Sequence, residues 1–220
     1  MLVFEAWGSF TSELVAAGLA IFIVYSMLRL VRVIRREYLL GFPVGFSFLA
    51  IGYIVFGLSY AYPALEELAS WVYLSIMTYG FAFIAGTYFL KKKSLWKRVG
   101  RMAAWFFSTL VVLAVAAVTV IVVPRGFLLP PYRAVDEIFR TTNLVSLGYI
   151  IFSLYQDFKP RRVGLGGIVL SGFVLLAGNQ YSLLLWGLDG GFWSFALAHA
   201  MGLVGLIMLA AALSTGFRRS

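Results

Sequence analysis

The stretch LVAAGLAIFIVYSMLRLVRVIRR, residues 14–36, decides the class of this protein. It carries no charge from Leu14 to Leu28 and then ends in an arginine-rich segment, residues 29–36. About 20 predominantly apolar residues can cross the hydrocarbon core of a bilayer as a helix. Arginines directly after such a run are typical of its cytoplasmic end. This stretch therefore predicts a transmembrane helix that enters the membrane from outside.

Similar apolar runs recur along the whole chain. Of its 220 residues, 62% are hydrophobic and 12% are charged, and the mean hydropathy is +0.93. A soluble domain is typically about 45–50% apolar and about 25% charged. The composition excludes an ordinary water-soluble fold, and we expect neither a soluble catalytic domain nor a nucleic-acid-binding one.

Charge clusters, prolines and glycines divide the chain into seven predicted spans. They cover residues 11–34, 38–60, 70–90, 103–123, 137–156, 163–187 and 192–215. Each is long enough to cross about 30 Å of hydrocarbon as a helix. We therefore expect an all-α polytopic membrane protein, with residues 1–220 forming a single seven-helix transmembrane domain.

The charges indicate the orientation of these spans. Fifteen of the 18 basic residues follow predicted spans one, three, five or seven, whereas seven of the nine acidic residues lie at the opposite ends. Because lysine and arginine are retained in short cytoplasmic loops, the N-terminus is expected outside and the C-terminus in the cytoplasm. The basic cluster from Lys91 to Arg101 sets this topology, and anionic lipid is a possible partner for it.

A parallel repeat is compatible with this order of spans. Spans one to three and five to seven run in the same directions, with span four between them, which gives a 3+1+3 pattern. Glu13 precedes Tyr25 by twelve positions, and Glu137 precedes Tyr149 by the same twelve. Predicted span four, residues 103–123, is almost entirely apolar and is expected to face lipid.

Polar residues gather at one depth, in the outer halves of four predicted spans. They are Glu13, Arg140, Asn143, Asn179, Gln180, Tyr181 and His199. Polar groups inside a membrane are costly, and a convergent set of donors and acceptors is what a pocket for a small polar or amphipathic ligand requires. Hydrogen bonds between neighbouring helices are the alternative interpretation.

Two expectations about these polar residues can be checked in a structure. Arg140 needs a counter-charge, and Glu13 and Glu137 are the candidates at its depth. If the outer layer is a water-accessible cavity, the carboxamides of Asn143, Asn179 and Gln180 should face a common space with the His199 ring. A dry interface would instead pair each of them with a neighbouring helix.

The topology resembles that of two known groups of seven-helix proteins. Seven spans with an outside N-terminus resemble rhodopsins and receptor-type modules, but a retinal pigment needs a Schiff-base lysine in its last span, and residues 192–215 contain none. The 3+1+3 order resembles sugar transporters of the SWEET type, although the Pro-Gln pair of their repeats is absent here. Neither resemblance extends beyond topology.

Cofactor and enzyme chemistry finds little support in the sequence. The chain has no cysteine and a single histidine, His199, so a haem ligand pair is not expected. Zinc spacings, P-loops and dinucleotide glycine motifs are also absent. We expect no metal, no cofactor and no enzyme activity, with a lipid-modifying enzyme as a minor alternative.

The function expected first is that of a receptor-like or sensor-like module. It would bind a small ligand in its outer half and signal through a separate cytoplasmic protein, since the chain ends a few residues after the last predicted span. Sensor regions of prokaryotic membrane histidine kinases resemble it in topology, and the plasma membrane is the expected location. The alternatives are a small transporter of 3+1+3 architecture and a structural subunit of a membrane complex. The protein partner expected for the chain is a cytoplasmic protein or a second copy of the chain itself, in a homo-oligomer. Only two Asn and two Gln occur, a scarcity also found in proteins of hot habitats.

Overall fold

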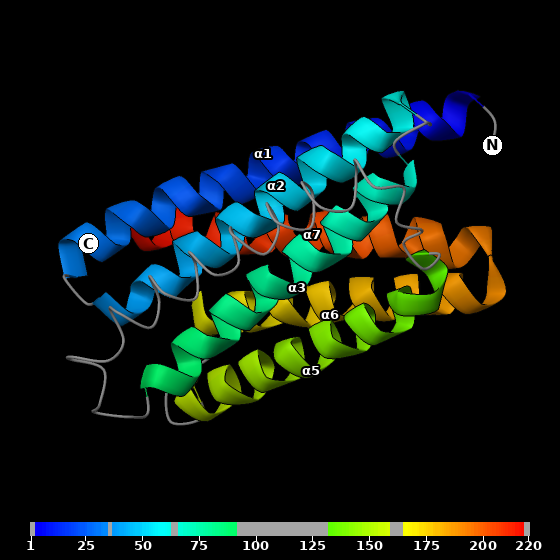
Figure 1. Ribbon diagram of the computed structural model, residues 1–220. Coiled ribbons are helices and arrows are strands. Elements are labelled where there is room, and N and C mark those ends of the chain that lie inside the picture. The colour runs from blue at the N-terminus through cyan, green and yellow to red at the C-terminus, as the bar shows by residue number, and fades with distance from the viewer. Residues whose placement is uncertain (1–2, 35–36, 63–65, 92–131, 159–164, 218–220) are drawn as a thin grey trace, which may run out of the picture.

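The computed structural model describes residues 3–34, 37–62, 66–91, 132–158 and 165–217, and the regular structure in these ranges is entirely helical. Six long helices run side by side along one axis (Figure 1). They are α1 (Val3–Ile34), α2 (Gly41–Ala61), α3 (Glu66–Lys91), α5 (Tyr132–Phe158), α6 (Leu165–Asp189) and α7 (Phe192–Phe217), and a short 3-10 helix, η1 (Glu37–Leu40), leads into α2. The prediction of an all-helical protein is confirmed.

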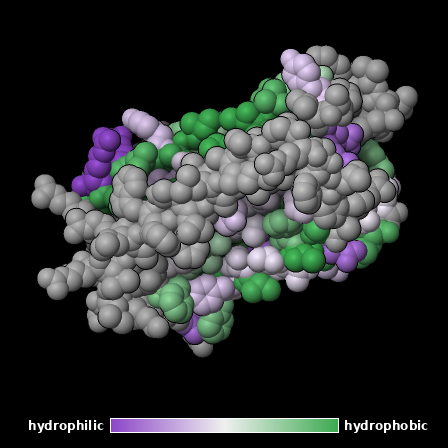
Figure 2. All heavy atoms as spheres, viewed as in Figure 1, coloured by the Kyte–Doolittle hydropathy of each residue, from purple (hydrophilic) through white to green (hydrophobic). Residues whose placement is uncertain are grey.

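The helices have the length and surface of membrane spans. Five of them, α1, α2, α3, α6 and α7, are long and apolar enough to cross a bilayer. Large apolar side chains such as Phe22, Val174 and Ile207 are exposed on the outside of the bundle. Figure 2 shows hydrophobic side chains between the ends of the bundle and hydrophilic ones toward the ends. This surface is suited to lipid rather than water, and the protein is membrane-embedded.

Helix α5 and predicted span four differ from the other predicted spans. Helix α5 contains predicted span five but is more polar than the other five long helices, because Asp136, Glu137 and Arg140 lie in its first half. Predicted span four, residues 103–123, and the basic cluster beyond Lys91 lie outside the described residues. The total of seven spans therefore stays a prediction.

The six long helices pack as a ring. Along the ring the order is α1, α2, α3, α5, α6 and α7, and α7 returns to α1. Packing is most extensive between α2 and α3 and between α6 and α7. Two ends of the bundle can be distinguished: the α1–α2 end, where α1 ends and α2 begins, and the α2–α3 end, where α2 ends and α3 begins.

Facing glycines bring two of these helix pairs together. In α2 and α3 they are Gly45 and Gly80, and a Cβ atom at Gly45 would lie 2.7 Å from the Gly80 carbonyl oxygen. In α6 and α7 they are Gly172 and Gly205, and a Cβ at Gly205 would lie 2.9 Å from the Gly172 carbonyl oxygen. Since only glycine has no Cβ, these crossings depend on it.

An apolar layer fills the centre of the ring toward the α1–α2 end. Phe46 of α2 and Phe173 of α6, from opposite positions in the ring, meet there with ring centroids 6.5 Å apart. The other largest fully buried side chains are Ile23, Leu49, Leu74, Met77, Phe81, Ile84, Leu147, Ile150, Leu176 and Leu206. The Phe46–Phe173 contact closes the middle of the bundle at this depth.

Candidate functional site

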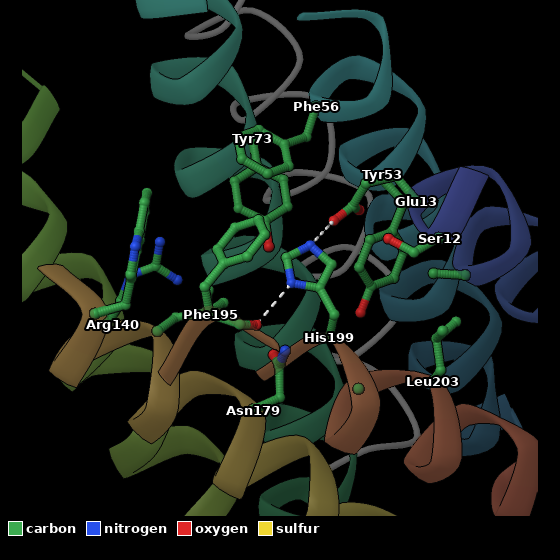
Figure 3. A pocket seen from close by; sticks show the side chains of 14 residues that line it. Ser12, Glu13, Tyr53, Phe56, Tyr73, Arg140, Asn179, Phe195, His199 and Leu203 are labelled. Atoms are coloured by element: carbon green, nitrogen blue, oxygen red, sulfur yellow. Dashed lines mark hydrogen bonds and ion pairs between the residues drawn. The ribbon is translucent and has the colours of Figure 1, made fainter. Parts of the chain in front are cut away.

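A small cavity lies in the ring toward the α2–α3 end, and every one of the six long helices contributes to its wall. Its lining residues are Ser12, Glu13, Ala16, Tyr53, Phe56, Tyr73, Arg140, Asn179, Leu183, Trp186, Phe195, His199, Gly202 and Leu203 (Figure 3). The cavity has about 30 Å³ of room for the centres of water molecules, which is space for roughly two waters. A ligand here would lie between all six long helices.

Glu13 and His199 join the first helix to the last across this cavity. Nε2 of His199 lies 3.1 Å from Oε1 of Glu13, and Nδ1 lies 3.0 Å from the carbonyl oxygen of Phe195, one turn earlier in α7. An isolated charge is costly inside a membrane. The favoured forms are a carboxylate beside an imidazolium or a neutral carboxyl group beside a neutral imidazole, and both have zero net charge.

Arg140 is paired within its own helix. Its Nε donates to Oδ2 of Asp136 at 2.6 Å, and both side chains are buried. Asp136 precedes Arg140 by four residues, which places both on one face of α5. Glu137 is rotated about 100° away from that face and is exposed. The expectation that Glu13 or Glu137 neutralises Arg140 is therefore wrong.

The three carboxamides form a chain of hydrogen bonds through α5, α6 and α7. Asn143 donates to Oε1 of Gln180 at 3.0 Å, and Gln180 donates to Oδ1 of Asn179 at 2.9 Å. Asn179 donates to the carbonyl oxygen of Ala198 at 2.8 Å. Of the four residues expected to face one space, Asn179 and His199 line the cavity, whereas Asn143 and Gln180 do not. The side chains of Asn143 and Gln180 instead form hydrogen bonds that connect neighbouring helices.

Tyr181 lies apart from the other predicted site residues. Its side chain is 53% exposed on the outside of α6, one residue beyond buried Gln180, and it does not line the cavity. The prediction placed it by depth alone, and depth does not specify which side of a helix faces inward.

Several cavity residues had not been predicted. The aromatic side chains of Tyr53, Phe56, Tyr73 and Trp186 form much of the wall, and no polar signal separates them from other aromatic residues of a membrane protein. Asp136 could have been found, because its spacing of four residues before Arg140 is the spacing of an intrahelical ion pair.

The cavity retains polar atoms that lack a partner. Oε2 of Glu13 and Nη1 of Arg140 are buried and make no hydrogen bond. The same holds for Nε2 of His199, which is close to Glu13 but not in hydrogen-bonding geometry, and for Oδ1 of Asp136, the ion-pair partner of Arg140, which does not line the cavity. Buried polar groups are normally satisfied by protein, water or ligand. The site thus offers a free acceptor on α1 and a free donor on α5.

The side chains do not assemble into a metal centre. Within the described ranges, no three His, Asp or Glu residues come together in a way that could hold a metal ion.

Comparison with protein-family models, characterised proteins and solved structures finds no match for this chain. A function has to follow from the site, because a fold alone does not define one.

Proposed function

We propose that this chain is a small transporter of 3+1+3 architecture, with its transport site in the cavity between two three-helix halves. The contact between Phe46 and Phe173 carries the proposal. Phe46 and Phe173 are 127 positions apart in sequence, they meet in the centre of the ring, and they close it on one side of a polar cavity. A central site that is closed on one side by matching residues is one state expected of alternating access.

The sequence around these phenylalanines supports a repeat. Residues 45–50 read GFSFLA and residues 172–177 read GFVLLA, so four of the six positions are identical. Gly45 and Gly172 begin the two segments, and each forms the close helix crossing described above. Leu49 and Leu176 are both fully buried. The two segments therefore have the same packing role in α2 and α6.

The same register extends to the first helix of each half. At a spacing of 127 residues, buried Ile23 in α1 corresponds to buried Ile150 in α5, and buried Ser26 corresponds to buried Ser153. Glu13 then corresponds to Arg140, and both line the cavity. The register predicted from Glu13 and Glu137 pairs a buried carboxylate with an exposed one and is replaced by this one.

In the last helix of each half the proposed register has a spacing of 125 residues, which pairs Gly80 with Gly205. The difference has a simple origin, because the connection between α6 and α7, residues 190–191, is two residues shorter than residues 62–65 between α2 and α3. The ring order also supports two halves, since α1, α2 and α3 are neighbours in sequence order, as are α5, α6 and α7.

Orientation is part of the proposal. Exposed Arg29 and Arg32 lie near the end of α1, at the α1–α2 end of the bundle, and Glu66 and Glu67 begin α3 at the other end. Because positive charge is typical of the cytoplasmic side, we propose that the α1–α2 end is cytoplasmic, with the cavity in the outer half of the membrane and the phenylalanine contact beneath it. A cysteine at Glu66 should react with an impermeant maleimide from outside, and one at Arg32 only from inside.

Transport can be tested without a known substrate, by asking whether the cavity is accessible from both sides of the membrane. The chain contains no native cysteine, so Leu203→Cys places a single thiol in the cavity wall. A transporter reconstituted in oriented vesicles should show labelling of this thiol by an impermeant maleimide from the outer side and, more slowly, from the inner side. Labelling from the outer side only would contradict transport.

A receptor-like module is the second candidate, and the carboxamide chain favours it. Asn179 lines the cavity and is bonded through Gln180 to Asn143 and directly to α7. A ligand that displaces Asn179 would therefore shift α5, α6 and α7 together, and a separate cytoplasmic protein could detect that shift. This function predicts one-sided labelling of Leu203→Cys, and the same experiment decides between the two.

A further inference from the structure

We propose that the cavity binds a small zwitterion, with the cationic group of the ligand at Glu13 and its anionic group at Arg140. This inference names the substrate class of the site under the proposed function. The binding step itself does not require transport, so the two can fail separately.

Two unpartnered atoms define the ends of the site. Oε2 of Glu13 is an acceptor without a donor, and Nη1 of Arg140 is a donor without an acceptor. Both side chains line the cavity although they are only 5% and 4% exposed. In Figure 3 they lie on opposite sides of the His199 ring. A ligand with an ammonium group and a carboxylate would satisfy both atoms with charge-assisted hydrogen bonds.

The charges of the site favour a zwitterion over a simple cation or anion. Asp136 already neutralises Arg140, and the Glu13–His199 pair is neutral in its favoured forms. A ligand with a single charge would either add an uncompensated charge inside the membrane, which is costly, or require the Glu13–His199 pair to lose or gain a proton. A zwitterion adds none, and its two ends meet groups of opposite sign.

The walls and the size limit the ligand further. Tyr53, Phe56, Tyr73 and Phe195 provide aromatic surface in the cavity wall, and such rings stabilise ammonium groups. The room for roughly two waters restricts the ligand in this conformation to the size of the smallest amino acids. Bulky zwitterions would need a more open cavity.

Direct binding to the purified full chain tests the inference. Radiolabelled glycine and alanine are bound to the protein in detergent, and unlabelled methylamine and acetate are offered as competitors that carry only one of the two charges. We expect at least one labelled zwitterion to bind saturably and neither competitor to displace it at equal concentration. Equal displacement by methylamine or acetate, or no binding of any zwitterion, would overturn the proposal, the latter leaving a cavity that holds only water.

Variants locate the two ends of the ligand. Glu13→Gln and Arg140→Lys should each weaken binding by roughly tenfold or more, because each removes a charge-assisted bond. Glu137→Gln removes an exposed carboxylate from the same helix as Arg140 and should leave binding unchanged. Glu13→Asp is a second variant in case Glu13→Gln does not fold, and it should also bind more weakly. Unchanged binding in folded variants at both positions would overturn the assignment, whereas two-sided labelling of Leu203→Cys would still support transport.

Discussion

Nε2 of His199 lies 3.1 Å from Oε1 of Glu13, so the only histidine of the chain connects the last described helix to the first. The contact lies where α7 returns to α1 and closes the ring. It also forms one wall of the cavity. A single pair of side chains thus contributes both to the closure of the bundle and to the chemistry of the site.

The first prediction concerns this pair. His199→Ala and Glu13→Gln should each lower stability, since each leaves a buried polar group without its neighbour. The double variant should cost less than the sum of the two, with a coupling energy of about 0.6–1.7 kcal/mol, the range found for polar pairs between membrane helices. Unfolding of the four proteins in detergent measures the cycle. Additive losses would show that the two side chains do not interact.

The second prediction concerns the ion pair of α5. Asp136→Asn and Arg140→Leu should both destabilise the protein, by about 3–5 kcal/mol if the remaining charge stays buried. Glu137→Gln is the matched control, because it removes an exposed carboxylate next to Asp136 and should change stability by less than about 0.5 kcal/mol. Melting temperatures in detergent give the comparison. A larger loss in Glu137→Gln than in Asp136→Asn would contradict the pairing.

The third prediction concerns the helix crossings. In Gly45→Ala the new Cβ would lie 2.5 Å from Cγ1 of Ile84, and in Gly172→Ala it would lie 2.8 Å from Cγ of Leu209. Overpacking of this kind typically costs about 1–3 kcal/mol, and both variants should be destabilised to a similar extent. Gly148→Ala serves as the control, since its Cβ would meet nothing within 4 Å. A loss in the control as large as in the crossings would mean that helix approach is not the cause.

Long apolar runs made much of the fold predictable. Each of the six long helices contains most of one predicted span, because a predominantly apolar segment of about 20 residues has few alternatives in a membrane. The proposed repeat was harder to find. A comparison based on charged residues matched Glu13 with Glu137, whereas the informative match is between two apolar segments, residues 45–50 and 172–177, whose residue types are common throughout such a chain.

The sequence predicted how deep in the membrane the site residues lie, but not which side of each helix faces the cavity. Glu13, Arg140, Asn179 and His199 do line one cavity, as their shared depth indicated. Tyr181 faces away from it, because one residue along a helix turns a side chain by about 100°. Charged partners four residues apart, as in Asp136 and Arg140, follow from helical spacing, but a partner on another helix, as for His199, requires the ring order of the helices, which the sequence does not contain.

The last prediction concerns closure beneath the cavity. Phe46 and Phe173 meet in the centre of the bundle, so under the proposed transport function Phe173→Ala should weaken the closed state and expose the cavity toward the α1–α2 end, the side proposed to be cytoplasmic. Truncation of a buried phenylalanine typically costs about 3–5 kcal/mol, and if even half of that differs between the closed and open states, the open population rises by roughly tenfold or more. Inner-side labelling of Leu203→Cys by an impermeant maleimide should accelerate accordingly.

Phe48 provides the control for this prediction, because it lies two residues from Phe46 but stacks on Phe83 within the α2–α3 pair, with ring centroids 5.5 Å apart. Phe48→Ala also removes a contact between two phenylalanine rings, but one away from the contact between α2 and α6, and it should leave the inner labelling rate of Leu203→Cys unchanged. Equal acceleration in both variants would indicate general loosening of the bundle. No acceleration in Phe173→Ala would mean that the phenylalanine contact is part of the core and does not act as a gate.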